Sequence, residues 1–218
     1  MNKVFISDIK WSYIFSYFGK GESLFRHYQD IVLKEISSDF EGDIIELGGE
    51  KIYNTQQFFK KNKIIVSNIS RDYDTYINVT EIPFQDNEVD NYLMVSMLQH
   101  VDQPLLAINE VKRTLKPGGK VLIINAFSHP ICDEKDYWRF GVDAYDLFFK
   151  DGYQIEKVFY LGGKLSMMSN TLRRPIGSFK WRFLFYKMIG FVISIIGKMM
   201  DKRDTMPIGI GVLVKKNL

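Results

Sequence analysis

The stretch "DIIELGGEKIYN", residues 43–54, joins a short apolar run to an acidic residue and two adjacent glycines. A continuous apolar run of this length, bounded by glycine, is typical of a buried strand, so we predict a strand over 43–47. A glycine directly after a strand lets the backbone approach a ligand, because no Cβ intervenes. The stretch therefore predicts a strand followed by a ligand-binding turn.

On both sides of this stretch, apolar strand patterns alternate with helical ones. Further strands are predicted over 63–67, 76–79, 90–95, 120–125, 154–161 and 208–215. Helices are predicted over 23–36, 53–61, 102–115 (capped by Asp102) and 143–149. The alternation predicts an α/β, Rossmann-like fold with a seven-stranded, mostly parallel sheet and helices on both faces. We expect a single domain: an N-terminal helical extension over 1–40, then the body over 41–218, with an apolar helix at about 179–204.

Composition narrows the function classes. At 218 residues, 46% hydrophobic and 25% charged, the chain can bury a full core. A net charge of +3 is too small to indicate nucleic acid, so we expect no such partner, and no metal site is predicted. The lone cysteine, Cys132, cannot form an internal disulfide, and Asp8 and Lys10 interrupt the first apolar stretch. We therefore expect no signal peptide and a cytoplasmic location.

The glycine turn restricts the ligand. A dinucleotide-binding turn needs glycines at spaced positions, and counting from Gly48 these fall on Glu50 and Tyr53. The spacing disfavours a nicotinamide or flavin cofactor, and the Glu50 carboxylate would repel a pyrophosphate. A ligand without phosphate and with positive charge fits better, and S-adenosylmethionine meets both conditions.

Four segments carry a resemblance to a known family. They are Glu46-Leu47-Gly48, "NVTEIPFQDNEVDNYLMVSMLQHV" (78–101), "EVKRTLKPGGKVLII" (110–124) and "DYWRF" (136–140). In this order and spacing, the chain resembles the class I S-adenosylmethionine-dependent methyltransferases of the type 11 branch. "DYWRF" resembles a segment found in a subset of them, several of which are encoded among surface-glycan genes.

The resemblance implies a set of cofactor-binding residues. They are Glu46, Gly48, Gly49, Asn68, Asn78, Val79, Ile82, Ser96 and Met97. The glycines would lie against the methionine part of S-adenosylmethionine, and Ser96 and Met97 under its sulfur. Val79 and Ile82 would sandwich the adenine, or serve as ordinary core. Glu46 would order the turn and face the cofactor's amino group, or be held by backbone N–H groups.

Three positions depart from the family pattern. Asn68 stands where the family usually has a carboxylate for the ribose hydroxyls, at an expected cost of about 1–2 kcal/mol in cofactor affinity. Asn78 replaces a common Asp at the adenine amino group, where an amide can still accept and donate. Glu50 replaces a glycine. We favour an outward orientation of Glu50 at the start of the following helix, although an inward one would occupy cofactor space.

Methyl transfer to a hydroxyl needs a base. The catalytic candidates are His129, His100 and Tyr137, with Asp133, Glu134 and Asp136 nearby. His129 ranks first because it follows the fifth predicted strand on the cofactor edge; its alternative role is a loop histidine bonded to backbone. We expect His100 to hold the loop after the fourth strand. Trp138 and Arg139 would either bind a sugar ring or pack on each other.

The segment "FKWRFLFYKMIGFVISIIGKMMDKRD", residues 179–204, predicts an apolar helix. Its charge-free run between Lys187 and Lys198 is about half of what a bilayer crossing needs. Lys180, Lys187, Ser194 and Lys198 would form one polar stripe. Three roles stay open: packing as a lid or on the sheet with this stripe in solvent, peripheral contact with the inner face of the membrane, and a homodimer contact.

The sequence therefore favours an enzyme that transfers a methyl group from S-adenosylmethionine. The expected acceptor is a small molecule, a glycan or a lipid-linked glycan, methylated on oxygen. The alternative is a catalytically inactive binding or scaffold protein with the same fold, to which Asn68, Asn78 and Glu50 point.

Overall fold

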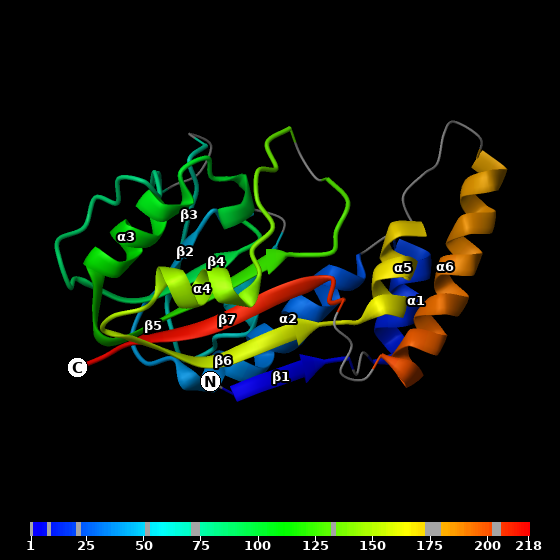
Figure 1. Cartoon of the computed structure of the whole chain (residues 1–218), viewed down its shortest axis with the longest axis horizontal. Helices are drawn as coiled ribbons and strands as arrows, with labels where there is room; N and C mark the ends of the chain where they lie inside the picture. Colours follow the sequence, from blue (N-terminus) through cyan, green and yellow to red (C-terminus); the bar gives the residue numbers. More distant parts are fainter. Residues whose placement is uncertain are drawn as a thin grey trace.

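The computed structural model describes residues 2–7, 10–20, 23–50, 53–70, 75–131, 134–172, 180–201 and 206–218. Its seven strands form one sheet in the order β1-β6-β7-β5-β4-β2-β3 (Figure 1). The strands are β1 (Asn2–Ile6), β2 (Ile44–Leu47), β3 (Ile64–Ser67), β4 (Val89–Val95), β5 (Leu115–Ala126), β6 (Tyr153–Leu161) and β7 (Gly209–Lys216). Every neighbouring pair is parallel except the two that involve β7. The predicted seven-stranded, mostly parallel Rossmann-like sheet is confirmed.

Six helices accompany these strands in the described part of the chain. They are α1 (Trp11–Lys20), α2 (Leu24–Ile36), α3 (Pro104–Thr114), α4 (Val142–Phe148), α5 (Lys164–Leu172) and α6 (Lys180–Met200). The Ser23 hydroxyl caps α2 by accepting a hydrogen bond from the Arg26 backbone N–H at 3.2 Å. Proline opens α3, where its missing N–H costs nothing. The N-cap position of α3 is Gln103 and not Asp102, so the predicted Asp102 cap is wrong.

The sheet is buried on both faces. Along β4, Tyr92 and Met94 point into one core cluster with residues of α3 and α4. Leu93 and Val95 point into the other cluster, with residues of α1 and α2. This alternation follows from the two-residue period of a strand, and it explains why β4 reads as one continuous apolar run.

One of the seven predicted strands, the third, does not form. Residues 76–79 form no strand, because only isolated bridges join Asn68 to Tyr76 and Asn78 to Glu81. The Asn78 side chain accepts hydrogen bonds from the Thr80 backbone N–H and hydroxyl, a local turn that competes with strand pairing. The missing strand is replaced by β1, which pairs parallel with β6. The first forty residues are therefore not purely helical; a domain division near residue 40 stays a prediction.

The predicted helix over 53–61 is also wrong. Within these residues, only Thr55–Gln57 form a short 3₁₀ helix. The Gln56 side chain donates to the carbonyls of Phe59 and Asn62 at 2.8 and 2.9 Å. These backbone carbonyls thus find hydrogen-bond donors without forming an α-helix. The described residues 53–61 therefore contain no α-helix.

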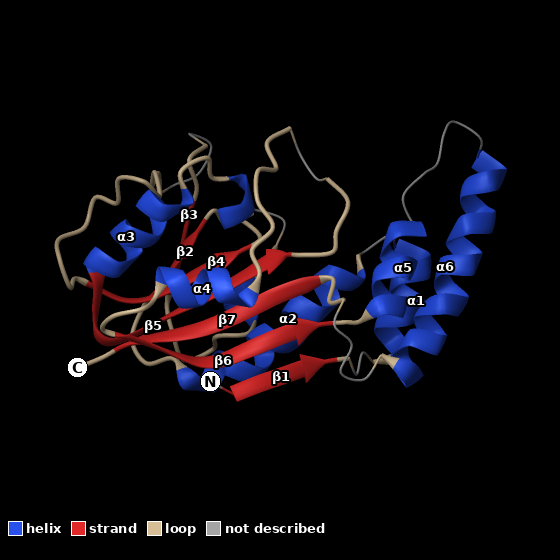
Figure 2. Cartoon of the chain, in the orientation of Figure 1, coloured by secondary structure: helices blue, strands red, loops and turns tan. Residues whose placement is uncertain are grey.

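Helices α1, α5 and α6 form a group beyond the C-terminal ends of β1 and β6 (Figure 2). Asp201, directly after α6, accepts hydrogen bonds from the Leu165 and Ser166 backbone N–H groups at 3.0 and 2.7 Å. Its carboxylate thus caps the start of α5 and ties the two helices together. Of the three roles left open for this helix, packing on the protein agrees with these contacts, but its expected polar stripe does not lie wholly in solvent, because Ser194 is only 3% exposed. Among the described helices, none combines the length and hydrophobicity that a bilayer crossing requires.

Candidate functional site

A cavity of about 760 Å³ opens at the C-terminal ends of β2 and β4. From β2 the chain runs outward to β3 and then crosses back to β4, so the direction of winding reverses between these strands. Ligands of open α/β sheets bind at such a switch point. The cavity is bounded by α2, the glycine turn, the loops after β3 and β4, and residues that follow β5.

The glycine turn forms the floor of this cavity. Gly48 has a φ of +71°, and a Cβ there would lie 2.7 Å from the Met97 Cβ. Ser96, beside it, also has a positive φ of 56° although it is not glycine. The Gln29 side chain donates to the Ser96 hydroxyl at 2.5 Å and so helps to hold this strained backbone in place. Only glycine fits at position 48 without moving the loop after β4.

Three predicted cofactor residues, Glu46, Gly49 and Ile82, are not among the described residues that line the cavity. Glu46 is 2% exposed and accepts a hydrogen bond from the Thr55 hydroxyl, and burial raises the pKa of its carboxyl to about 7. A Cβ on Gly49 would meet Val66 at 2.4 Å, so this glycine lets the turn pack on β3. Glu46 and Gly49 therefore support the glycine turn through contacts outside the cavity lining, and Ile82 belongs to the hydrophobic core.

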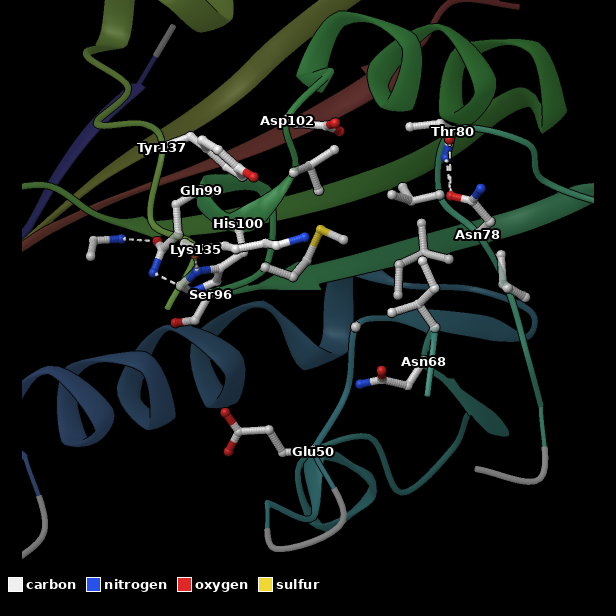
Figure 3. Close-up of a pocket in the computed structure, with 18 of the residues that line it drawn as sticks. Glu50, Asn68, Asn78, Thr80, Ser96, Gln99, His100, Asp102, Lys135 and Tyr137 are labelled. Atoms are coloured by element: carbon white, nitrogen blue, oxygen red, sulfur yellow. Dashed lines mark hydrogen bonds between the residues drawn. The ribbon is translucent and has the colours of Figure 1, made fainter. Parts of the chain in front are cut away.

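Glu50 lies at the rim of the cavity (Figure 3). Its carboxylate pairs with the Arg26 guanidinium at 3.1 Å, and its side chain is 59% exposed. The same guanidinium lies 4.0 Å above the Tyr53 ring, which fixes its position. The contact agrees with the predicted outward orientation, although the helix that Glu50 was expected to start is absent.

Asn68 and Asn78 line the opposite end of the cavity from His100 (Figure 3). The Asn68 amide donates to the Gly49 carbonyl at 2.9 Å, and its oxygen accepts from the Ser70 N–H at 3.0 Å. The Asn68 amide groups that could bind a ribose are therefore already used to hold the glycine turn in place. The Asn78 oxygen is engaged by Thr80, which leaves the amide N–H groups to face a ligand.

At the other end, His100 connects the loop after β4 to the segment that contains "DYWRF". Its Nδ1 contacts the Lys135 carbonyl, and its Nε2 lies 3.1 Å from the Gln99 amide nitrogen. Because a carbonyl only accepts and an amide N–H only donates, Nδ1 carries the proton and Nε2 accepts. Both ring nitrogens are thus engaged within the protein, as expected of a loop-holding histidine. Tyr137, held through its backbone N–H on the Gln99 carbonyl, lines the cavity.

The "DYWRF" segment is held by its own contacts. Asp136 and Arg139 form a two-point ion pair, with the Asp136 side chain 1% exposed. The Trp138 indole N–H donates to the Val101 carbonyl at 2.8 Å. These contacts fix the loop beside the cavity and engage Arg139 and the Trp138 N–H, two groups that were candidates for sugar binding. Of the other candidates for a base, Asp133 lies outside the described residues.

His129 lines the cavity where the chain leaves β5. Its Nδ1 lies 2.9 Å from the Pro130 carbonyl, and its ring packs against Phe25 with centroids 5.7 Å apart. A proton on Nδ1 leaves the Nε2 lone pair as the basic site. Of the two predicted catalytic histidines, only His129 thus presents a ring nitrogen that no described residue is shown to engage.

Sequence reasoning missed the contribution of α2. Phe25, Arg26 and Gln29 all line the cavity, although the helix pattern indicated only its apolar face. Gln29 is 1% exposed, and its Oε1 has no hydrogen-bond partner among the described atoms. A glutamine on the buried face of this amphipathic helix was the available signal. An unpartnered buried acceptor at a cavity wall suits a ligand that donates hydrogen bonds.

Part of the chain is similar in sequence to known methyltransferases. Residues 54–123, roughly a third of the chain, match the family described as methyltransferase domain. The ubiquinone/menaquinone biosynthesis C-methyltransferase UbiE of Haemophilus ducreyi is 30% identical over 98 residues, which are 45% of this chain and 33% of that protein. The chain spans between about a fifth and a third of the length of the curated relatives it matches. The narrower likeness to the "DYWRF" subset stays a prediction.

Solved structures share the whole architecture. A SAM dependent methyltransferase from Archaeoglobus fulgidus superposes with a TM-score of 0.56 at 13% identity, covering 95% of this chain and 100% of that one. The cyclase SpnF superposes with a TM-score of 0.56 at 12% identity, covering 89% and 81%. Identities this low show the fold and not the reaction. The chain therefore shares the Rossmann-like fold of these structures, and its residues 54–123 match the methyltransferase domain family.

Proposed function

We propose that this protein is an S-adenosylmethionine-dependent methyltransferase. The observation that carries the proposal is the cavity at the β2–β4 switch point, floored by a glycine turn that tolerates no Cβ. Its volume of about 760 Å³ falls in the range of small-molecule and cofactor sites.

The residues present suit this cofactor. The Gln29 Oε1 is a buried acceptor for which a ligand ammonium would be a partner. The Asn78 amide N–H groups suit an adenine ring nitrogen, since donors and acceptors then match. Glu50, paired with Arg26 at the rim, leaves the space beside Gly48 open. Asn68 is the weak point, because its amide already braces the turn.

The chemistry needs little from the chain beyond alignment and a base. The cofactor supplies a methyl group on a positively charged sulfur. Gly48, Ser96 and Met97 line the cavity together with Phe25 and Tyr137, so an acceptor and the cofactor could be held next to each other there. The Nε2 of His129 would take the proton that a hydroxyl acceptor releases.

We propose a hydroxyl of a saccharide or lipid-linked glycan as the acceptor. Two features support it: the likeness of "DYWRF" to proteins encoded among surface-glycan genes, and aromatic side chains, Phe25 and Tyr137, which can pack against a sugar ring. The UbiE match carries no acceptor information for this chain, because it covers a third of that protein. The rival function is a non-catalytic scaffold, and the cyclase SpnF illustrates that one fold serves different reactions.

Calorimetric titration with S-adenosylmethionine and S-adenosylhomocysteine tests the proposal. We expect micromolar dissociation constants for both, because the cavity offers a rigid floor and unsatisfied polar groups. A folded sample that binds neither ligand at millimolar concentration would contradict the enzyme and leave the scaffold. Once binding is shown, transfer of a labelled methyl group to free sugars, undecaprenyl-linked sugars and quinones separates the acceptor classes.

A further inference from the structure

Helix α6 carries its apolar residues on the outside. Phe185, Met188, Val192, Ile196 and Met199 follow one another at spacings of three or four residues, and their exposed fractions run from 41% to 67%. At 100° per residue these five side chains fall within a single sector of the helix. They form one continuous apolar stripe in solvent.

The opposite side of α6 faces the protein with small and polar residues. Gly190, Ser194, Gly197 and Asp201 are buried at the same helical spacing. Gly197 and Asp201 approach the start of α5, and the Ser169 hydroxyl donates to the Gly190 carbonyl at 2.6 Å. These close contacts need small residues, so the helix cannot turn its apolar stripe inward without losing them.

The stripe continues onto α1. Trp11 and Phe15, one helical turn apart, are 47% and 60% exposed. Phe15 contacts the Phe191 ring of α6 with centroids 5.9 Å apart, and the Lys198 ammonium lies 5.5 Å above the Trp11 ring. We call these seven residues, the five of the α6 stripe together with Trp11 and Phe15, the α1/α6 face. A patch of this kind on a soluble protein marks an interaction surface.

The segment of the sequence that contains α5 and α6 is strongly basic. Residues 164–206 carry nine Lys and Arg against two Asp, which leaves 20 basic and 24 acidic residues in the rest of the chain. The segment is therefore +7 on a chain whose remainder is −4. An apolar helical face combined with a strongly basic segment is the pattern of a helix that lies in the interface of an anionic membrane.

We propose that the α1/α6 face binds an anionic membrane surface, with α6 lying parallel to the bilayer plane. A second copy of the chain is the less favoured occupant, because a two-fold contact would bring two +7 segments together. Trp11 suits the headgroup level, where an indole ring is partly apolar and partly wet. The proposal does not depend on the proposed function, since it rests on residues outside the cavity.

Such binding would place the cavity near the lipid surface. The α1/α6 face and the cavity both lie at the edge where the parallel strands end, and α2, which lines the cavity, follows α1 in the chain (Figure 1). An acceptor with a lipid tail would then reach Phe25 and Tyr137 from the bilayer side.

Vesicle co-sedimentation tests the proposal with the full chain. We expect binding to vesicles of phosphatidylcholine with phosphatidylglycerol, weak binding to phosphatidylcholine alone, and a loss of the difference between them at about 1 M salt, where the Debye length falls to about 3 Å. The double variant Val192→Gln/Ile196→Gln should reduce the partition coefficient roughly tenfold or more, because two buried apolar contacts are removed.

The matched control is Leu105→Gln/Leu106→Gln, which removes two equally exposed apolar side chains from α3, on the far side of the molecule. It should leave the partition coefficient unchanged, and both variants should melt at the wild-type temperature. Failure of the wild type to sediment with either vesicle would overturn the proposal. So would equal binding by the α6 variant, or a dimer seen by ultracentrifugation that this variant abolishes while vesicles have no effect.

Discussion

Replacing Gly48 by alanine should damage the cofactor cavity far more than its small size suggests. Gly48 has a φ of +71°, where a Cβ is strained, and the new Cβ would lie 2.7 Å from the Met97 Cβ. Gly152→Ala is the matched control. Gly152 has nearly the same φ, +77°, but a Cβ there would meet nothing within 4 Å, and the residue is remote from the cavity lining.

The two variants share one cost and differ in another. A non-glycine residue in left-handed backbone costs about 1–2 kcal/mol, which applies to both. Only Gly48→Ala adds overpacking against Met97, whose Cβ is fixed by its own backbone and cannot swing aside; overpacking costs about 1–3 kcal/mol. We therefore expect unfolding free energies to fall by about 1–2 kcal/mol for Gly152→Ala and about 2–5 kcal/mol for Gly48→Ala.

Binding gives the sharper contrast. Because relief of the contact moves either the glycine turn or Met97, Gly48→Ala should weaken S-adenosylmethionine binding by about tenfold or more, which is about 1.4 kcal/mol. Gly152→Ala should bind as the wild type does. Urea denaturation and calorimetric titration of both variants measure the two effects. An unchanged dissociation constant for Gly48→Ala, at temperatures where it is folded, would refute the claim that this turn floors the cofactor site.

Three further outcomes are expected. Burial raises the pKa of the Glu46 carboxyl from 4.5 to about 7, so the folded state binds this proton more tightly and stability falls as the pH rises through that window. In urea denaturation, the unfolding free energy of Glu46→Gln should therefore equal that of the wild type near pH 4.5 and exceed it by about 3 kcal/mol above pH 7. The exposed control Glu35→Gln should show no such dependence on pH. Asp201→Ala should lower the unfolding free energy by about 2–4 kcal/mol, because two backbone N–H groups at the start of α5 lose their acceptor; exposed Asp151→Ala should stay within about 0.5 kcal/mol, and equal losses in the two variants would refute the capping role. His129→Ala should reduce kcat by about 10²-fold or more with cofactor affinity unchanged, as measured with a defined hydroxyl acceptor, and full turnover would show that another group is the base.

The departures at Asn68 and Glu50 have structural explanations that differ from one another. The Asn68 amide donates to the Gly49 carbonyl. This hydrogen bond stabilises the turn, but the same N–H group is then not available to a ribose. Glu50 pairs with Arg26 on α2 and so links the glycine turn to the helix that forms the cavity wall. An exposed pair of this kind adds little stability, about 0–1 kcal/mol, and its effect is to position the rim.

The sequence by itself determined the alternation of elements and the location of the site. β2, β4 and β5 lie where apolar runs predicted them, α2 and α3 follow their 3.6-residue periods, and Gly48 lies at the predicted turn. These features can be predicted locally, because the pattern of residues close together in the sequence determines strand burial, helix periodicity and the need for a glycine. Nine of the twelve predicted site residues line the cavity for the same reason, since the ends of parallel strands meet at one edge.

Only the tertiary structure decided the features that depend on distant partners. The edge strand is β1 and not residues 76–79, because β6 offers it a parallel partner while the Asn78 turn removes the alternative. Both ring nitrogens of His100 are engaged in hydrogen bonds, one with Gln99 and one with Lys135, which is 35 residues away in the sequence. The apolar stripe of α6 faces outward because Asp201 and two glycines on the opposite side of the helix pack against α5. Amphipathic pattern indicates which residues share a face, but close packing with another helix decides which face is buried.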